Sequence, residues 1–248
     1  MRGVLLILTV LAALNVEAAA LSAECAGVAS RPAPRWTECA PSFRLGVENA
    51  SNPTQSTVEA REGKYSLAFT SPPTPSMNRS EVFLADNLPL DADLWYGFSM
   101  FLPAIAPTAW AIVSQVWQRD AGNPVFDMVL LPSGLAMEVR NDAFPTGGGV
   151  RIHTSPAVVG QWVDYVIHFR GGDLGHVEAW SKAPTDRCYA LRASYQGAVG
   201  KSRWAGAEIS EKSVYPKIGI YRNASLAAQT VYFDSVFVGA ERPSFCET

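Results

Sequence analysis

Ten stretches that read as β-strands, with no sustained helical pattern after residue 20, constrain the fold of this chain more than any other feature. Side chains that alternate between two faces are the signature of a β-strand. The predicted strands span 64–70, 79–84, 94–103, 111–118, 125–131, 134–141, 161–170, 175–180, 215–222 and 229–239. Glycine- and proline-rich turns punctuate them. Many medium strands separated by such turns predict an all-β jelly-roll sandwich.

Two further expectations concern particular segments. In 161–170 we expect Val163, Tyr165, Ile167 and Phe169 to form the row that faces the core. Residues 182–214 are the least regular part of the chain, and we expect them to form a long loop that closes one end of a cleft.

The first 20 residues differ from the rest of the chain. Arg2 precedes an apolar run and then the small residues 18–20, which is the pattern of a secretory signal peptide. We therefore expect a secreted protein, with 21–42 as an irregular leader tethered by disulfide bonding and 43–248 as a single domain. No later segment approaches the ~20 apolar residues that a membrane span needs.

Cysteine content and charge limit the partners. Four cysteines in an exported chain favour two disulfides, and three pairings of Cys25, Cys39, Cys188 and Cys246 stay open. The formal net charge of −3, without basic runs, gives no nucleic-acid footprint. We expect a monomer that binds neither nucleic acid nor membrane. Three Asn-x-Ser sequons are candidate glycosylation sites, at Asn49, Asn78 and Asn223.

The strand at 215–222 carries the strongest functional signal. Alternation places Lys217, Gly219 and Tyr221 on one face, and Ile218 and Ile220 on the other. An ammonium and a phenol separated by a glycine leave open space for an anionic ligand across the sheet, with a tyrosine placed for proton transfer. An ordinary solvated strand face is the alternative interpretation.

Two more strands carry polar pairs on one face. Arg79 and Glu81 lie two residues apart, either as a structural ion pair or as an arginine that clamps a substrate carboxylate with Glu81 fixing its orientation. Gln115 and Trp117 pair an amide with an indole, which suits sugars because they offer both hydroxyls and apolar faces. That pair is equally compatible with an ordinary exposed strand.

Several of these stretches occur in the same order in a known family. The chain resembles the polysaccharide lyase superfamily of β-jelly rolls that includes glucuronan lyases and heparin lyase I. The matching stretches are GKYSLAF, RSE at 79–81, WYGFSMFLP, IVSQVW, QWVDYVIHF, PKIGIYR and VYFDSVFVG. The resemblance covers about residues 63–239 and implies a sandwich of the concanavalin A-like lectin/glucanase type.

The resemblance also implies an activity, which is β-elimination on an acidic polysaccharide such as glucuronan or alginate. The Lys-x-x-x-Tyr strand of the family matches Lys217 and Tyr221, with Tyr221 as base and acid. Arg79 and Gln115 match the family's arginine and glutamine, and would neutralise the uronate carboxylate as charge develops. Lys217 and Arg79 would favour the phenolate of a tyrosine, whose pKa is ordinarily ~10. The expected substrate contacts are Lys217, Glu81, Trp117 and Arg222.

The resemblance further places a structural calcium ion near the last strand. Asp234 would be one ligand and Glu48, from the first strand, another, since calcium takes oxygen ligands from distant segments. We expect no other cofactor.

One departure from the family keeps a second function open. The family often has Gln-Trp-His where this chain has Gln115-Val116-Trp117, and its histidines lie elsewhere, at 153, 168 and 176. The chain therefore works through tyrosine alone, uses a different acid, or is a lectin-like carbohydrate-binding protein that does not cleave. A glycoside hydrolase is disfavoured, because Asp164 with Glu178 is the only loose candidate for its carboxylate pair.

Overall fold

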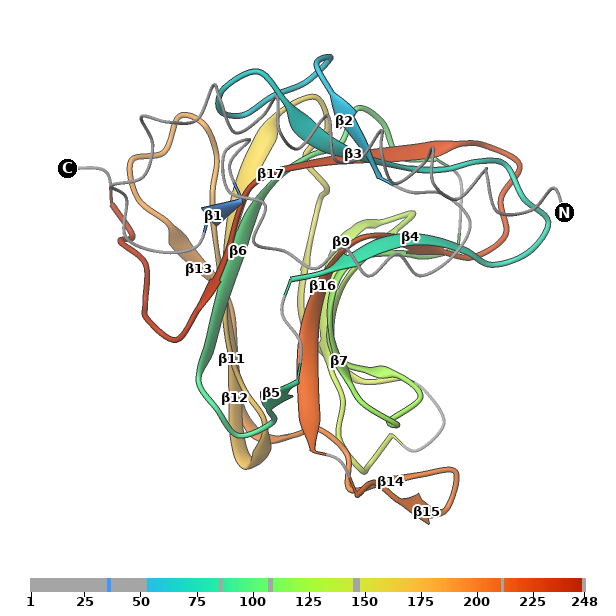
Figure 1. Ribbon diagram of the computed structural model, residues 1–248, viewed down its shortest axis with the longest axis vertical. Coiled ribbons are helices and arrows are strands. Elements are labelled where there is room, and N and C mark those ends of the chain that lie inside the picture. The colour runs from blue at the N-terminus through green and yellow to red at the C-terminus, as the bar shows by residue number, and fades with distance from the viewer. Residues whose placement is uncertain are drawn as a thin grey trace, which may run out of the picture.

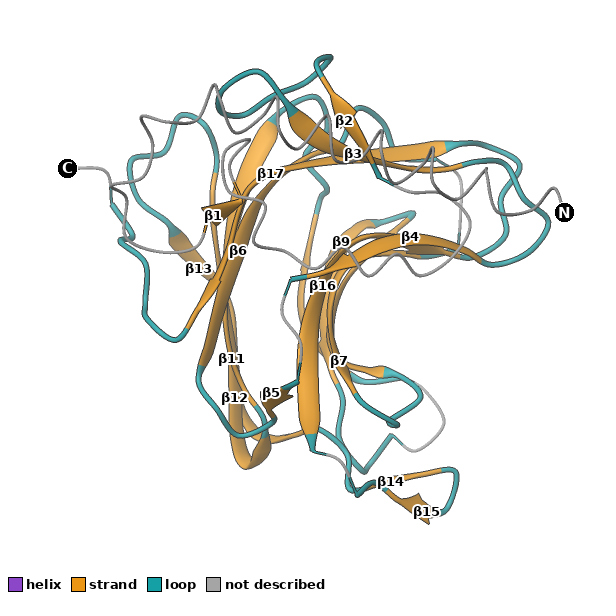
Figure 2. Cartoon of the chain, viewed as in Figure 1, coloured by secondary structure: helices purple, strands orange, loops and turns teal. Residues whose placement is uncertain are grey.

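Two antiparallel β-sheets pack face to face in this protein (Figure 1). The computed structural model describes residues 35–36, 53–84, 87–106, 109–144, 148–210 and 212–246. Within these ranges every regular element is a strand, as Figure 2 shows by its colours. The predicted all-β sandwich is confirmed.

The larger sheet has eight strands in the order β13-β12-β11-β6-β17-β3-β2, with β1 also paired to β17. Its strands are β1 (Arg35–Trp36), β2 (Thr54–Ser56), β3 (Ser66–Ser71), β6 (Leu94–Phe101), β11 (Trp162–Arg170), β12 (Gly172–Lys182), β13 (Ala190–Val199) and β17 (Gln229–Gly239).

The second sheet has seven strands in the order β10-β9-β8-β7-β16-β4, with β5 beside β16. They are β4 (Asn78–Phe83), β5 (Leu88–Pro89), β7 (Ala111–Gln118), β8 (Pro124–Leu131), β9 (Gly134–Val139), β10 (Val150–Ser155) and β16 (Ser213–Arg222). A separate small hairpin pairs β14 (Arg203–Trp204) with β15 (Ala207–Glu208).

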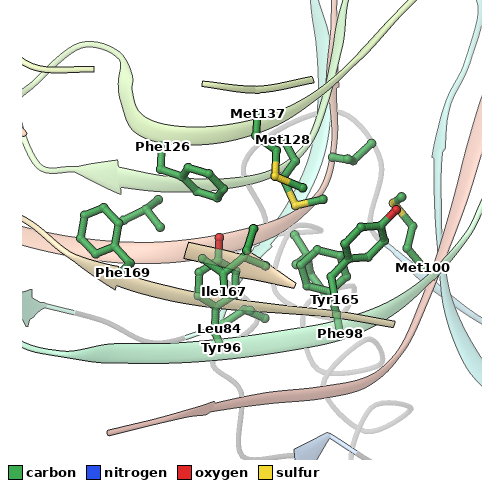
Figure 3. Close-up of a cluster of buried hydrophobic side chains, with 14 of the residues drawn as sticks. Leu84, Tyr96, Phe98, Met100, Phe126, Met128, Met137, Tyr165, Ile167 and Phe169 are labelled. Carbon is green, nitrogen blue, oxygen red and sulfur yellow. The ribbon is translucent and has the colours of Figure 1, made fainter. Parts of the chain in front are cut away.

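The core fills the space between the two sheets. Figure 3 shows Phe126 and Met128 of β8 above Tyr96 and Phe98 of β6, and all four side chains are fully buried. The predicted inward row of β11 belongs to this core, as do Ile218 and Ile220 of β16. Because alternate residues of each strand enter the core, the residues between them must lie on the outer faces of the sheets.

The expectation of a long loop over 182–214 is wrong. Strand β12 continues to Lys182, and β13 (Ala190–Val199) pairs with it at the edge of the larger sheet. Of the ten residues of β13 only Ala193 and Val199 are buried, so its alternation is weak in the sequence. Edge strand β10 (Val150–Ser155) was missed for the same reason, because none of its residues is fully buried.

One disulfide joins Cys188, which precedes β13, to Cys246 near the C-terminus. It fixes one of the pairings that the sequence left open. Cys25, Cys39 and Glu48, the expected signal peptide and most of the expected leader lie outside the described residues. Among the residues that are described, no helix has the length and apolarity to cross a bilayer.

Candidate functional site

A groove of about 600 Å³ lies on the outer face of the seven-stranded sheet. Five neighbouring strands line it: β4 with Arg79, β16 with Tyr221, β7 with Trp117, β8 with Asp127 and β9 next to Arg140. These strands are adjacent in the sheet order β9-β8-β7-β16-β4. A polymer lying in the groove would therefore cross the strands.

Strand register divides the floor of the groove into two rows. Lys217 pairs with Gln115, Gln115 with Asp127, and Asp127 with Glu138, which gives one polar row across four strands. Nearer the other end of the strands, Tyr221 lies opposite Ile112, and Ile112 opposite Val129, which gives an apolar row. The polar row is largely buried, and of its members only Asp127 and Glu138 line the groove, beside the apolar row.

Tyr221 belongs to the apolar row and is partly exposed. Its ring packs edge-on against Trp110, with ring centroids 5.1 Å apart. The Arg79 guanidinium lies 4.1 Å from the centre of the Tyr221 ring, so this cation stacks on the ring. The phenolic hydroxyl donates to Met77 Sδ at 3.4 Å. The structure brings Arg79 and Tyr221 together, through the ring face of the tyrosine.

Glu81 joins Arg79 to Gln115. Its Oε2 atom is 3.9 Å from Arg79 Nε, and its Oε1 atom accepts a hydrogen bond from Gln115 Nε2. Glu81 and Gln115 are buried beneath the groove surface. The predicted arginine, glutamate and glutamine therefore come together, and the glutamate holds the other two in place.

Lys217 lies in an aromatic box. Its ammonium is 4.7 Å from the ring centre of Phe83, 5.0 Å from that of Trp117 and 5.3 Å from that of Tyr215. Only 1% of Lys217 is exposed, so its charge is shielded by the rings and not displayed at the groove surface. Trp117 itself forms part of the groove wall.

A charged cluster at the far side of the groove was not predicted from the sequence. Arg140 Nη1 is 2.9 Å from Asp127 Oδ2, and Arg140 Nη2 is 2.9 Å from Glu138 Oε2. Arg151 Nη2 is 2.7 Å from the other oxygen of Glu138. Burial raises the pKa of Asp127 to about 6, although the Arg140 charge opposes this rise. The sequence signal was a charged residue inside otherwise apolar strands, at 127, 138 and 140.

The sequence comparison identifies the family. The sequence profile described as polysaccharide lyase matches residues 35–237. The chain belongs to this family.

Solved structures show the same fold for this family member. An endo-β-1,4-glucuronan lyase from the fungus Trichoderma reesei matches with a TM-score of 0.61 and 16% identity, over 80% of this chain and 91% of that one. The cellulose induced protein Cip1 gives 0.55 and 13%, over 82% and 90%. The family 7 alginate lyase A1-II′ with bound product gives 0.51 and 18%, over 75% and 82%. No curated protein sequence matches the chain.

Arg222 lies away from the groove of this family member. Since it follows Tyr221 in β16, its side chain points to the opposite face, and it is fully buried. Arg222 Nε donates to Ser71 Oγ at 2.7 Å, and Nη2 donates to the carbonyl oxygens of Ser71 at 3.1 Å and Pro72 at 2.8 Å. It joins β16 to the end of β3, so we remove it from the expected substrate contacts.

Gly219 has a different role from the expected one. Its φ angle is +142°, which side-chain-bearing residues rarely adopt. A Cβ atom there would collide with the backbone of Ser80 and Glu81 in β4. The glycine allows β4 to approach β16 closely, which brings Glu81 and Arg79 into the site.

The surroundings of Asp234 do not fit a calcium ligand. Its carboxylate accepts hydrogen bonds from the backbone N–H groups of Arg61 at 2.8 Å, Glu62 at 3.1 Å and Ser235 at 2.6 Å. Burial raises the pKa of Asp234. A carboxylate held by three N–H donors anchors the chain around Arg61 to β17, whereas a calcium ligand directs its oxygens at the cation. Calcium binding stays an untested prediction.

Proposed function

We propose that this protein cleaves a uronic-acid polysaccharide by β-elimination, with Tyr221 as the catalytic base and acid. The observation that carries the proposal is a partly exposed phenol in a groove that also contains two guanidinium groups, those of Arg79 and Arg140. Family membership supports lyase chemistry. Two of the similar structures are those of a glucuronan lyase and an alginate lyase, so these two polyuronates are the substrates we would test first.

The reaction needs a base and a cation close together. The base removes the C5 proton, which is α to the uronate carboxylate, and the electrons form the C4=C5 double bond as the C4–O bond breaks. Negative charge grows on the carboxylate during this step, and a fixed cation stabilises it. Arg79 is our candidate for this cation, because its guanidinium is stacked on the Tyr221 ring.

Tyr221 performs both proton transfers in this proposal. After it takes the C5 proton, it returns a proton to the leaving 4-oxygen on the same side of the sugar, which is a syn elimination. Gln115 and Lys217 are buried, so we assign them the role of positioning groups beneath the groove. Trp117 supplies an aromatic wall for the sugar rings, and Glu81 holds Arg79.

A second function, carbohydrate binding without cleavage, is favoured by one observation. None of the chain's three histidines is among the side chains that line the groove in the described part of the chain. If proton transfer in this family member needed an imidazole, the groove would bind a polymer without turning it over.

Turnover distinguishes the two functions. The protein would be incubated with glucuronan, polymannuronate and polyguluronate, with an uncharged β-glucan as the control. Absorbance at ~235 nm reports the unsaturated product of elimination. A rise on a polyuronate, and none on the glucan, supports the lyase. Saturable binding without any rise supports the lectin-like function, and neither binding nor turnover contradicts both.

Tyr221→Phe tests the mechanism. We expect kcat to fall by about 10²–10⁴-fold, the usual loss of a general acid–base group, with polymer binding retained. Tyr232→Phe is the matched control, because Tyr232 lies on β17 of the other sheet. The activity of this variant should equal that of the unaltered protein. A Tyr221→Phe variant with full activity would remove Tyr221 from the mechanism.

A further inference from the structure

Three ligand-type side chains converge on the outer face of the eight-stranded sheet. Asp93 precedes β6, His168 lies in β11 and His176 in β12. These strands are neighbours in the order β12-β11-β6. Their neighbours in sequence, such as Ile167 and Phe169, enter the core, so the cluster faces away from it. The core therefore separates the cluster from the groove.

The three ligand atoms form a compact triangle. His168 Nε2 is 3.0 Å from Asp93 Oδ1, His176 Nε2 is 3.2 Å from His168 Nε2, and His176 Nε2 is 3.8 Å from Asp93 Oδ1. Ligand atoms held 2.0–2.1 Å from a tetrahedral zinc ion lie roughly 3.3 Å from one another. The three observed separations bracket that value, so one ion can reach all three atoms with small movements.

A second layer of contacts holds the ligands in place. Trp95 stacks on the His168 ring, with centroids 3.9 Å apart and planes 9° apart. Glu178 Oε2 is 3.6 Å from His168 Nδ1, and His176 Nε2, at 3.1 Å from that nitrogen and 3.2 Å from His168 Nε2, lies close to both nitrogens of the ring. Arg170 Nη1 is 3.8 Å from the second oxygen of Asp93. A carboxylate behind a ligating histidine and a partner for the ligating carboxylate are typical of metal centres in proteins.

We propose that Asp93, His168 and His176 bind one divalent zinc ion. Two imidazole nitrogens and one carboxylate oxygen favour zinc over calcium or magnesium, which prefer oxygen ligands alone. Asp93 is half-exposed, so water can complete a tetrahedral site. The ion would tie the start of β6 to the β11–β12 hairpin, and this role does not depend on the function of the groove.

Direct titration tests the site. The purified chain is stripped with a chelator and titrated with ZnCl₂ alone in a calorimeter, and then with CoCl₂, whose visible spectrum reports tetrahedral coordination. We expect one zinc ion per chain and a higher Tm in its presence, because binding to the folded state alone stabilises it. CaCl₂ should give no heat at this site.

Variants assign the ligands. His176→Gln and Asp93→Asn should each weaken zinc affinity by more than about tenfold, and should abolish the tetrahedral cobalt spectrum. His153→Gln is the matched control, because His153 is the chain's third histidine and lies on β10 of the other sheet. It should bind zinc as the unaltered chain does.

Two results would overturn the proposal. One is the absence of saturable zinc binding to the intact chain. The other is a zinc affinity that neither ligand substitution changes, which would show that zinc binds at a different site. Should His176→Gln fail to fold, Asp93→Asn decides, since Asp93 is half-exposed and its replacement keeps the stack of Trp95 on His168.

Discussion

The outer faces of the two sheets both carry buried charged side chains, but these charges are satisfied in different ways. On the eight-stranded sheet, Asp164 accepts a hydrogen bond from Ser99 Oγ at 2.6 Å and two from the Arg61 guanidinium at 3.2 and 3.1 Å. Asp234, on the same sheet, takes three backbone N–H donors. The fold itself supplies hydrogen-bond partners to both of these carboxylates.

On the groove face, the hydrogen bonding of the buried polar side chains is less complete. Asp127 Oδ1 and Gln115 Oε1 are buried and have no hydrogen-bond partner within the described ranges of the chain. These two residues are cross-strand neighbours in the polar row. A buried polar atom without a partner is costly, so natural proteins keep few of them.

The two faces also differ in what covers them. Trp95, Val166 and Trp180 of the eight-stranded sheet are packed beneath Tyr189 and Phe245. The disulfide between Cys188 and Cys246 holds both of those segments on the sheet. The groove face has no such cover over Tyr221 in the described structure. The outer face of the eight-stranded sheet is therefore covered by packed aromatic side chains, whereas that of the seven-stranded sheet carries an open groove.

Removing the disulfide should have the largest effect on stability and the least on the groove. Cysteines 58 residues apart constrain the unfolded chain by about 4 kcal/mol in the loop-entropy treatment. We expect the double variant Cys188→Ala, Cys246→Ala to lose that much free energy of unfolding in denaturant titrations. Its kcat on a polyuronate, measured where it is still folded, should match the intact protein. Loss of turnover in the folded variant would contradict the conclusion that the disulfide-covered face and the groove face act independently.

The pH dependence of stability should expose the incomplete polar row. Because the pKa of folded Asp127 is raised to about 6, the folded state binds more protons than the unfolded state between pH ~4 and ~6. The contribution of Asp127 to stability therefore falls as pH rises through this window, by up to about 3 kcal/mol. Asp127→Asn should lack this decline. The free energy of unfolding of the variant, relative to that of the intact protein, should therefore increase from pH 4 to pH 6.

Denaturant titrations at pH 4, 5, 6 and 7 measure that difference. Asp173→Asn, an exposed substitution on β12 of the other sheet, is the control for removing one carboxylate. Parallel curves for Asp127→Asn and the intact protein would contradict the raised pKa, and with it the contrast between the two faces.

Most of the fold could be predicted from the sequence because the central strands are rich in apolar residues, being buried at nearly every position, and are separated by glycine- and proline-rich turns. In β11, the four residues predicted to face inward are all in the core. The edge strands β10 and β13 were missed because they bury few side chains. A strand shows an alternating pattern in its sequence only when one of its faces is buried and therefore apolar.

The site could be predicted only in part. Alternation put Tyr221 on an outer face of its strand, and the family resemblance put Arg79 in the same site, where the structure pairs the two residues. The alternation rule, applied strictly, would have excluded Arg222, which follows Tyr221. The cluster of Asp127 and Arg140 needs the register between β8 and β9, which a single sequence does not contain. The burial of Lys217 depends on aromatic rings from three strands, and is likewise beyond sequence reasoning.

Arg79→Lys should have the smallest effect and sharpens the contrast within the groove. Lysine keeps the positive charge but lacks the planar group that stacks on the Tyr221 ring at 4.1 Å. A stacked cation at a partly exposed site contributes about 0.5–1 kcal/mol, so we expect kcat/KM on a polyuronate to fall roughly two- to sixfold. Arg119→Lys is the matched control, because Arg119 lies 6.0 Å from the Tyr215 ring and outside the groove lining. Equal losses in both variants would mean that stacking on Tyr221 has no special part in turnover.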